Sequence, residues 1–230
     1  MKITWLGHSG FRLEIGGEVL LIDPWLRGAP SFDEARFDEA VAGATALLLT
    51  HGHFDHASNA VEIAKAAGVK LHGMFDMVGW LAEQGGVEAV GFNKGGTIEI
   101  GDVRVTMTHA VHSSSQMVDG RPVYLGGEAG FMIRGEGRTL YFAGDTDVFS
   151  DMAILQELHR PEIGVLPIGG HFTMDAERAA YACRKFFDFR EVIPCHYATF
   201  PLLAQSAEPF ARAVAPTRTR VLEVMAPQAL

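Results

Sequence analysis

The sequence predicts a mixed α/β (α+β) fold in which strands precede helices in each half of the chain. Short apolar runs separated by Gly-Gly or Gly-Asp turns predict β-hairpins. Apolar residues that recur every three or four positions predict amphipathic helices. Because the strand-to-helix order occurs twice, we expect an architectural pseudo-repeat, without a matching repeat of the sequence itself.

The first half is expected to open with strands. Residues 2–6 form one strand, and 11–22 form a hairpin around Gly16-Gly17. The irregular segment 25–37 is interpreted as an active-site flap. The elements expected next are strand 46–50, helix 57–67, strand 69–71, helix 76–84, strand 87–92 and hairpin strands 98–100 and 103–108.

The second half is expected to repeat this order. Its predicted elements are hairpin strands 128–134 and 138–143, helix 148–159, strand 163–168, helix 175–187, strand 191–193, helix 202–214 and strand 220–224. The helix at 175–187 has a clear apolar face that includes Cys183, which is therefore predicted to be a core residue. No linker-like segment divides the chain, so we expect a single domain spanning 1–230.

Composition narrows the class of protein. The 230 residues are 48% hydrophobic and 20% charged, which is typical of a soluble globular protein. No apolar run approaches the roughly 18 residues of a membrane span, and no signal-peptide pattern opens the chain. Two cysteines do not indicate a disulfide framework, so a cytoplasmic location is expected. The net charge of −9 disfavours non-specific nucleic-acid binding.

One run concentrates metal-binding chemistry. His51, His53, Asp55 and His56 lie within six residues, after an apolar strand and before a helical pattern. Residues two apart in an extended segment point the same way, so His51 and His53 can share one cation. Asp55 and His56, at the turn into the helix, can serve a second. Imidazole and carboxylate ligands suit zinc, iron or manganese, whereas the alternative is a histidine-rich surface loop.

Three further candidates each follow a predicted strand, where functional loops can converge. These are His112, Asp145 and His196. Each has an alternative interpretation. His109 could replace His112 as a ligand, Asp145 could cap the helix that follows it, and His196 could be a core histidine.

These motifs together resemble the signature of the metallo-β-lactamase superfamily over nearly the whole chain. The more specific resemblance is to the UPF0173 (YtkL-like) metal-dependent hydrolases, and the chain is also similar to ascorbate-6-phosphate lactonases and N-acyl-phosphatidylethanolamine phospholipase D. The stretches that carry it are Trp5–Ser9, Thr50–His56, His112–Ser114, Ala143–Thr146, Pro167–Gly170, Phe172–Met174 and Ile193–Tyr197. The resemblance implies a four-layer αβ/βα sandwich of two mixed β-sheets flanked by helices.

The resemblance also implies a dinuclear site and assigns its ligands. It gives the first metal to His51, His53 and His112, the second metal to Asp55, His56 and His196, and a bridging role to Asp145. Two divalent ions are therefore expected, with zinc first and manganese, iron or nickel as alternatives.

Other polar residues are expected to surround these ligands. They are His8, Asp23, His171, Tyr197 and Thr199. Metal-bound histidines usually donate their second ring N–H to a carboxylate or carbonyl, and Asp23 is the predicted acceptor. His8 is also a catalytic candidate, together with Asp55, which could steer the proton of the nucleophile. His8 and His171 can equally be loop histidines at the mouth of the site.

The predicted function is metal-assisted hydrolysis of an ester, lactone, amide or phosphodiester bond in a small molecule. A hydroxide held between two cations would be the nucleophile, since bound water has a pKa near 7 instead of about 15.7. Lys94, Arg121 and Arg12 are candidates for binding an anionic substrate. Asp145 replaces the cysteine ligand of many β-lactamases, which disfavours that activity.

Two other functions are retained as alternatives. One is a metal-stabilised binding module without turnover, although a complete ligand set argues against it. The other is an RNA- or DNA-processing nuclease, which the acidic composition disfavours. The sequence does not determine whether the chain forms a homo-oligomer.

Overall fold

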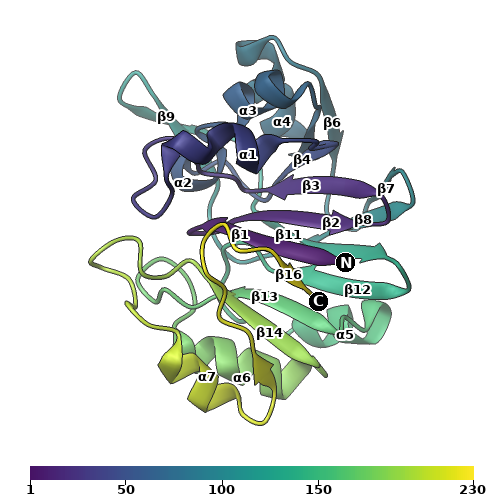
Figure 1. Ribbon diagram of the computed structural model, residues 1–230, viewed down its shortest axis with the longest axis vertical. Helices are drawn as coiled ribbons and strands as arrows, with labels where there is room; N and C mark the ends of the chain where they lie inside the picture. The colour runs from purple at the N-terminus through teal and green to yellow at the C-terminus, as the bar shows by residue number, and fades with distance from the viewer.

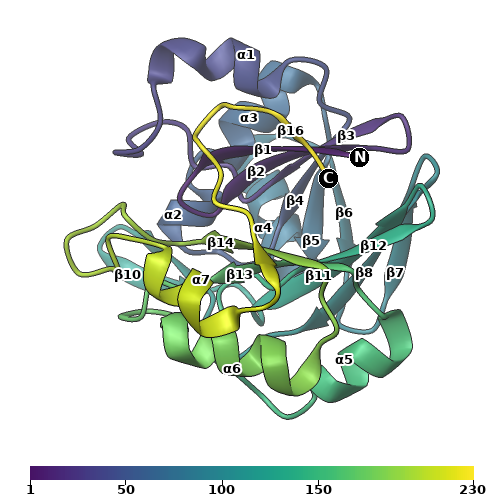
Figure 2. The same cartoon turned by 60° about the horizontal axis from the view of Figure 1, so that its bottom comes forward.

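The computed structural model describes all of residues 1–230 and contains two seven-stranded sheets packed face to face (Figures 1 and 2). The first sheet, in spatial order, consists of β16 (Gln228–Ala229), β1 (Lys2–Gly7), β2 (Gly10–Ile15), β3 (Glu18–Ile22), β4 (Ala46–Leu49), β5 (Leu71–Met74) and β6 (Ala89–Phe92). The second consists of β15 (Arg218–Thr219), β14 (Glu191–Cys195), β13 (Ile163–Pro167), β12 (Arg138–Phe142), β11 (Ala129–Gly135), β8 (Val103–His109) and β7 (Thr97–Ile100).

Helices cover the outer side of each sheet, which completes the predicted four-layer αβ/βα sandwich (Figure 2). The first sheet is covered by α1 (Phe37–Val41), α3 (Ala60–Ala67) and α4 (Phe75–Gly85), and the second by α5 (Met152–His159), α6 (Ala176–Phe186) and α7 (Glu208–Val214). The core is one cluster of 64 buried residues drawn from both sheets. Cys183 lies in it, as predicted from the apolar face of its helix. None of the helices has the length and apolar character that a bilayer crossing requires.

The pseudo-repeat is visible in the strand directions. In the first sheet, β1, β2 and β3 are antiparallel neighbours, and β3 to β6 are parallel. In the second, β7, β8, β11 and β12 are antiparallel neighbours, and β12 to β15 are parallel. Each half therefore places the carboxyl ends of its parallel strands, and the loops that follow them, at one edge of its sheet.

Three predicted elements differ from the structure in the last third of the chain. The strand expected at 220–224 is wrong, because the β-pairing of this segment with the first sheet is limited to an isolated bridge between Trp5 and Val224. The helix expected at 202–214 begins at Glu208. Pro201 lies in the loop before it, which closes on itself through the Ala198 N–H and the Ala204 carbonyl. The helix expected at 148–159 begins at Met152.

The segment 113–127, which carried no predicted element, contains a separate two-stranded hairpin that projects from the sandwich (Figure 1). Its strands are β9 (Ser115–Val118) and β10 (Arg121–Tyr124). The turn between them is Asp119-Gly120, and both residues have positive φ, as a type I′ turn requires. This Asp-Gly pair was the available sequence signal.

The expected flap at 25–37 is packed instead of open. It contains the 3-10 helix η1 (Glu34–Arg36), and the side chains of Trp25, Leu26 and Phe32 are buried. The ring of Trp25 meets that of His8, a candidate site residue, edge-on at a centroid distance of 5.7 Å.

Candidate metal centre

The loop after β4 carries two histidines on an extended backbone. β4 is buried along its whole length, and His53 has φ −66° and ψ 155°, so residues 51–53 remain extended. The Nε2 atom of His51 and the Nδ1 atom of His53 consequently face each other at 3.0 Å. Gly52 lies between them against the projecting hairpin, where an added Cβ would come 2.8 Å from Leu125 Cδ1.

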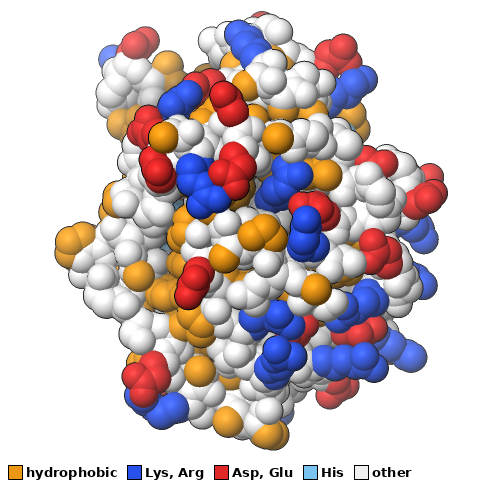
Figure 3. All heavy atoms as spheres, in the orientation of Figure 1, with side chains coloured by type: hydrophobic (Ala, Val, Ile, Leu, Met, Phe, Trp, Pro, Cys, Tyr) orange, Lys and Arg blue, Asp and Glu red, His pale blue; other side chains and the backbone are white.

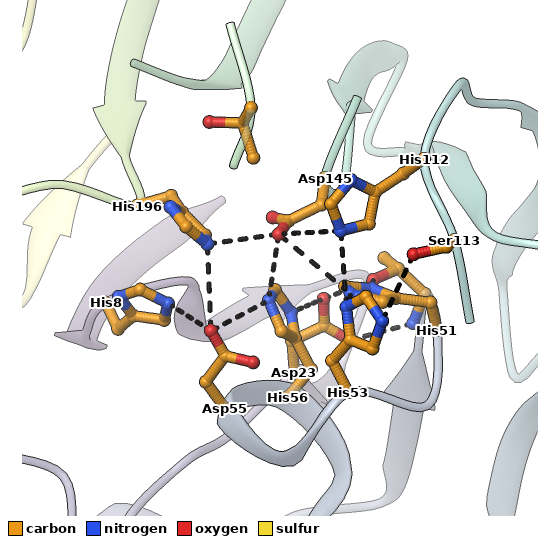
Figure 4. Close-up of polar contacts among 12 residues, drawn as sticks. His8, Asp23, His51, His53, Asp55, His56, His112, Ser113, Asp145 and His196 are labelled. Atoms are coloured by element: carbon orange, nitrogen blue, oxygen red, sulfur yellow. Dashed lines mark hydrogen bonds and ion pairs between the residues drawn. The ribbon is translucent and has the colours of Figure 1, made fainter. Parts of the chain in front are cut away.

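The helix after this loop begins earlier than predicted. α2 (Phe54–Ala57) starts three residues before the expected position, and a break separates it from α3. Asp55 and His56 therefore lie on helix α2 itself and turn away from the two preceding histidines (Figure 4). The amide N–H of His56 donates to the carbonyl of His53 at 3.1 Å, which closes the turn.

Other loops bring the remaining candidates to the same place. His112 follows β8, Asp145 follows β12 and His196 follows β14, while His8 and Asp23 follow β1 and β3. Three of these residues have positive φ: 50° at His8, 45° at Asp23 and 55° at His196. For a non-glycine residue this backbone costs about 1–3 kcal/mol and is concentrated at functional sites.

The first group of donor atoms is formed by three histidines and one carboxylate oxygen (Figure 4). Besides the His51–His53 pair, His112 Nε2 lies 3.2 Å from His53 Nδ1. Asp145 Oδ2 lies 3.9 Å from His51 Nε2 and 3.6 Å from His112 Nε2. Four donor atoms from three loops thus surround one point.

The second group shares the same carboxylate oxygen. Asp145 Oδ2 lies 3.0 Å from His196 Nε2 and 3.3 Å from His56 Nε2. Asp55 Oδ2 lies 3.7 Å from His196 Nε2 and 3.9 Å from His56 Nε2. Asp145 therefore stands between two groups of three donors each (Figure 4).

Hydrogen bonds behind the cluster determine where two imidazole protons lie. The Thr50 hydroxyl donates to Asp23 Oδ2 at 2.5 Å, so its oxygen accepts from His51 Nδ1 at 3.0 Å. His56 Nδ1 donates to Asp23 Oδ2 at 2.9 Å. Both histidines consequently point Nε2 at the centre, and His56 Nε2 has no hydrogen-bond partner.

This arrangement fits bound cations. The nitrogen atoms of the first group approach one another to 3.0 and 3.2 Å, so a single cation can contact all three. Ligands about 2.1 Å from a tetrahedral ion lie roughly 3.4 Å apart, which is close to the spacings found here. Asp145 Oδ1 is also buried without a hydrogen-bond partner. Both groups therefore have the donor chemistry and spacing of metal sites.

The electrostatics of the first group favour neutral imidazoles. Burial, followed by the neighbouring histidines, lowers the pKa of the His51 ring well below its ordinary value. Burial and the adjacent imidazoles also lower the pKa of His53, and burial lowers that of His112. Neutral imidazole is the form that binds metals, so these rings need no deprotonation at neutral pH.

In the second group, the carboxylates and imidazoles shift each other's pKa values. Burial alone would raise the pKa of Asp145, but His196 and His56 hold it well below its ordinary value. Burial alone would lower the pKa of His56, but three surrounding carboxylates raise it well above its ordinary value. These are Asp145, Asp55 and Asp23. Without a cation, His56 thus holds a proton, which a divalent ion bound at Nε2 would displace.

Asp23, the predicted acceptor behind the candidate ligands, accepts hydrogen bonds from both Thr50 and His56 at Oδ2. The other oxygen, Oδ1, accepts from the Thr50 amide N–H at 2.8 Å, and the amide group of asparagine cannot accept at both positions, so Asp23→Asn is expected to weaken metal binding by about 10–100-fold. Asparagine tolerates the positive φ, so the backbone is retained. Titration of the metal-free protein with zinc, followed by calorimetry, measures the effect.

Asp119→Asn provides the matched control for this substitution. Asp119 also has positive φ, at 48°, but is exposed in the projecting hairpin. Its variant should bind zinc with unchanged affinity. Equal affinities for the Asp23 variant and the unaltered protein would contradict a supporting role for Asp23.

His8 lies next to the second group. Its Nε2 is 3.0 Å from Asp55 Oδ2, and its Nδ1 is 2.9 Å from the Thr199 hydroxyl oxygen. Burial, the main cause, lowers the pKa of His8 to about 4, so the ring is neutral at neutral pH. A neutral ring that donates from Nε2 to Asp55 orients the Asp55 carboxylate, and the Thr199 hydroxyl beside Nδ1 donates to the Tyr197 carbonyl at 3.1 Å.

Three other histidine and tyrosine candidates lie outside the cluster. His171 is exposed and packs against Phe172 at a centroid distance of 4.6 Å. Tyr197 stacks on Trp5 at 5.4 Å, and its hydroxyl makes no polar contact with the cluster. His109 ends β8 with its side chain exposed, and its Nδ1 lies 3.3 Å from the Lys94 amine. The geometry thus separates His109 from His112, although the sequence left both open.

Three hydroxyl residues beside the candidate ligands were not predicted. The Thr50 hydroxyl keeps the proton of His51 on Nδ1. The Ser113 hydroxyl lies 3.3 Å from His53 Nε2, and Ser114 Oγ accepts from the Gly52 N–H at 3.1 Å. Their sequence signal was position, because Thr50 directly precedes the candidate ligand His51 and the Ser113-Ser114 pair directly follows the candidate ligand His112.

The centre opens into a pocket of about 530 Å³. Its floor is formed by His53, Asp55, His112, Asp145 and His196, with Ser113 beside them. Its wall is formed by Phe54, Phe172, Phe200, Pro201 and Leu202. No lysine or arginine lines this pocket, so the three cationic residues considered for substrate binding lie elsewhere.

Comparison with known proteins finds a matching family model and several similar proteins. Residues 2–196 match the family model described as the beta-lactamase superfamily domain. A UPF0173 metal-dependent hydrolase from Dinoroseobacter shibae is 60% identical over 225 residues, covering 98% of each chain. One from Cereibacter sphaeroides is 61% identical over 208 residues, covering 90% of each chain. Igni18, a metallo hydrolase from the archaeon Ignicoccus hospitalis, is 31% identical with a TM-score of 0.86 over 100% of this chain and 98% of that one.

Proposed function

We propose that this chain, which belongs to the metallo-β-lactamase superfamily and to its UPF0173 branch of metal-dependent hydrolases, cleaves ester, lactone or phosphodiester bonds in small molecules. The observation that supports this most directly is the shared position of Asp145 Oδ2. It stands within 3.9 Å of nitrogen donors from both groups. A carboxylate oxygen between two donor groups is the arrangement expected of a two-metal hydrolase.

In this proposal, each group of donors holds one divalent cation. The first cation is held by His51, His53 and His112, the second by Asp55, His56 and His196, and Asp145 is shared by both. When bound, the cations would supply a hydroxide at neutral pH and stabilise the negative charge that develops on the attacked group. Zinc is the first expectation for this nitrogen and oxygen set, with manganese, iron and nickel as alternatives.

The remaining residues would prepare the centre for this chemistry. Asp23 holds the proton of His56 on Nδ1, and Thr50 holds that of His51 on Nδ1. His8 fixes the rotation of the Asp55 carboxylate. Asp55 also lines the pocket and is ionised, because His56 and His8 hold its pKa below the ordinary value although burial alone would raise it. It is therefore placed to accept a proton from an attacking water.

The expected stoichiometry is two divalent ions per chain, because each donor group supplies three ligands besides Asp145. The test removes metal with a chelator, restores zinc or manganese, and measures bound metal by elemental analysis. Hydrolysis is then assayed on p-nitrophenyl esters, lactones and bis(p-nitrophenyl) phosphate. One ion or none after reconstitution would contradict the dinuclear proposal.

The same panel separates the alternatives. A metal-stabilised binding module would take up two ions and hydrolyse none of the substrates. A nuclease would cleave RNA or DNA oligonucleotides faster than any small ester or diester in the panel. Only turnover of small molecules that requires the added metal supports the proposed activity.

We further propose that the chain acts as one domain in the cytoplasm. One apolar cluster includes residues of both sheets, which favours cooperative folding of 1–230. Both cysteines, Cys183 and Cys195, are buried and unpaired, which suits a reducing compartment. A single calorimetric unfolding transition of the metal-loaded protein is the expected result.

A further inference from the structure

Exposed apolar side chains gather at the pocket over the metal centre. Phe54, Phe172 and Leu202 line it, although 57%, 50% and 63% of their respective surfaces are exposed. Figure 3 shows apolar side chains beside a hollow at the left edge, the side where α2 lies in Figure 1. Exposing large apolar groups to water costs free energy, so their grouping around one cavity marks a ligand-binding wall.

The loops that carry this wall are fixed to each other and to the metal centre. Phe172 lies in the loop after β13, and Leu202 lies in the loop after β14. The two loops are joined by a hydrogen bond of 2.9 Å from the Ala204 N–H to the Gly169 carbonyl. Gly169 packs so closely on the His196 carbonyl that a Cβ would clash. The wall is therefore held at a set position relative to a ligand of the second group.

A buried tryptophan supports the wall from behind. Trp25 meets Phe54 edge-on at a centroid distance of 5.5 Å and Phe200 at 5.8 Å. The same ring contacts His8 at 5.7 Å. Phe54 and Phe200 are consequently held in place before any ligand binds, which reduces the entropy lost on binding.

The pocket offers no side-chain cation to an anionic substrate. Arg178, in the adjoining cavity that shares Phe172, forms two hydrogen bonds of 2.7 and 2.6 Å with the Asp147 carboxylate. Lys94 lies 3.9 Å from the Glu128 carboxylate, and Arg12 donates to backbone carbonyls of residues 40 and 42. Apart from the proposed cations at the floor, a substrate with several negative charges would therefore find no side-chain cation to offset the hydration that it loses against the apolar wall.

From these observations we propose that the pocket selects uncharged substrates that carry an aryl or alkyl group beside the bond to be cleaved. This inference rests on the proposed hydrolytic function and names its substrate class: neutral carboxylic esters and lactones. The apolar group lies on Phe54, Phe172 and Leu202, and the carbonyl faces the donor atoms. Water adds to the acyl carbon, the carbon–oxygen bond to the alcohol breaks, and the alcohol oxygen takes a proton. A cavity of about 530 Å³ accommodates a small-molecule group of this kind.

The first test varies the apolar group. The zinc-loaded protein is assayed on p-nitrophenyl acetate, butyrate and hexanoate, and kcat/KM is expected to rise by roughly fourfold per added methylene while the group still contacts the wall. Phe172→Ala and Leu202→Ala should flatten this dependence, mainly through KM. Leu158→Ala is the matched control, because Leu158 is 71% exposed on α5 and lies outside this pocket.

The second test measures binding without turnover. The zinc-loaded protein is titrated with 4-phenyl-1-butanol, a neutral alcohol that it cannot hydrolyse, and binding is followed by calorimetry. Phe172→Ala is expected to raise Kd by roughly five- to tenfold, whereas Leu158→Ala leaves it unchanged. Phe172→Leu, which keeps an apolar side chain, should recover much of the affinity.

The outcomes separate this inference from the proposed activity. If the esters are hydrolysed with no dependence on chain length, or if Phe172→Ala binds the alcohol as tightly as the unaltered protein, the substrate class is overturned and the hydrolase stands. If no ester is hydrolysed but the alcohol binds through Phe172, the proposed reaction fails and the apolar subsite stands. Faster turnover of a doubly charged phosphate ester than of the hexanoate would also overturn the inference.

Discussion

Replacing Asp145 with asparagine is expected to release one metal ion per chain and to lower the hydrolytic rate by orders of magnitude, with the fold retained. Its Oδ2 lies 3.0 Å from His196 Nε2 and 3.6 Å from His112 Nε2, so it serves both donor groups. Two cations about 3.5–4 Å apart repel strongly, and a shared anionic oxygen offsets that repulsion. Asparagine keeps the shape of the side chain but removes its charge.

The structure excludes the capping role that the sequence left open for Asp145. The next helix, α5, begins at Met152, and Asp151 occupies its N-cap position. A capping residue would in any case lose only about 1 kcal/mol or less on replacement by asparagine. Asp151→Asn is thus a suitable control, expected to retain both ions and full activity. For the Asp145 variant, elemental analysis measures the bound ions, kcat measures the hydrolytic rate, and thermal unfolding shows whether the fold is retained. Two retained ions with near-normal turnover would refute the shared-ligand arrangement.

The parts of the site that follow from local periodicity were predictable from the sequence. Alternation along an extended segment predicts that His51 and His53 face the same way, and their nitrogens lie 3.0 Å apart. The placement of Asp145 and His196 directly after apolar strands predicts that they meet at one edge, because parallel strands share a carboxyl end. In these cases the chemistry and the secondary structure are set by adjacent residues.

The features of the site that depend on contacts between distant loops could not be predicted from the sequence. Phe54, Phe172 and Leu202 are ordinary apolar residues in the sequence, and only the folded loops bring them to one pocket. His171 and Tyr197 adjoin motif residues, but the direction of each side chain is set by packing, against Phe172 and Trp5 respectively. The positive φ angles at His8, Asp23 and His196 likewise depend on the tertiary structure around them.

The second large effect is expected at His112. Its Nε2 lies 3.2 Å from His53 Nδ1, so His112→Ala would leave the first group with two imidazoles and the shared oxygen. Loss of the ion from the first group is expected, together with a loss of activity comparable to that of the Asp145 variant. Cobalt substitution makes the measurement specific, because the visible absorption of Co(II) reports the number and type of its ligands.

His109→Ala is the control that resolves the ambiguity in the sequence. His109 ends β8, packs edge-on against Phe149 at 5.1 Å and is exposed, so its variant should keep both ions.

His112 differs from His109 because the chain has left the sheet by that point. The preceding residue, Val111, donates its N–H to the Thr146 hydroxyl and accepts from the Asp147 N–H, at 3.0 Å in each case. These two bonds join the loop of His112 to the loop of Asp145, which explains why the imidazole three residues beyond the strand, and not the one at its end, faces the shared carboxylate. If only the His109 variant lost an ion, His109 at the end of β8 would be the ligand instead of His112.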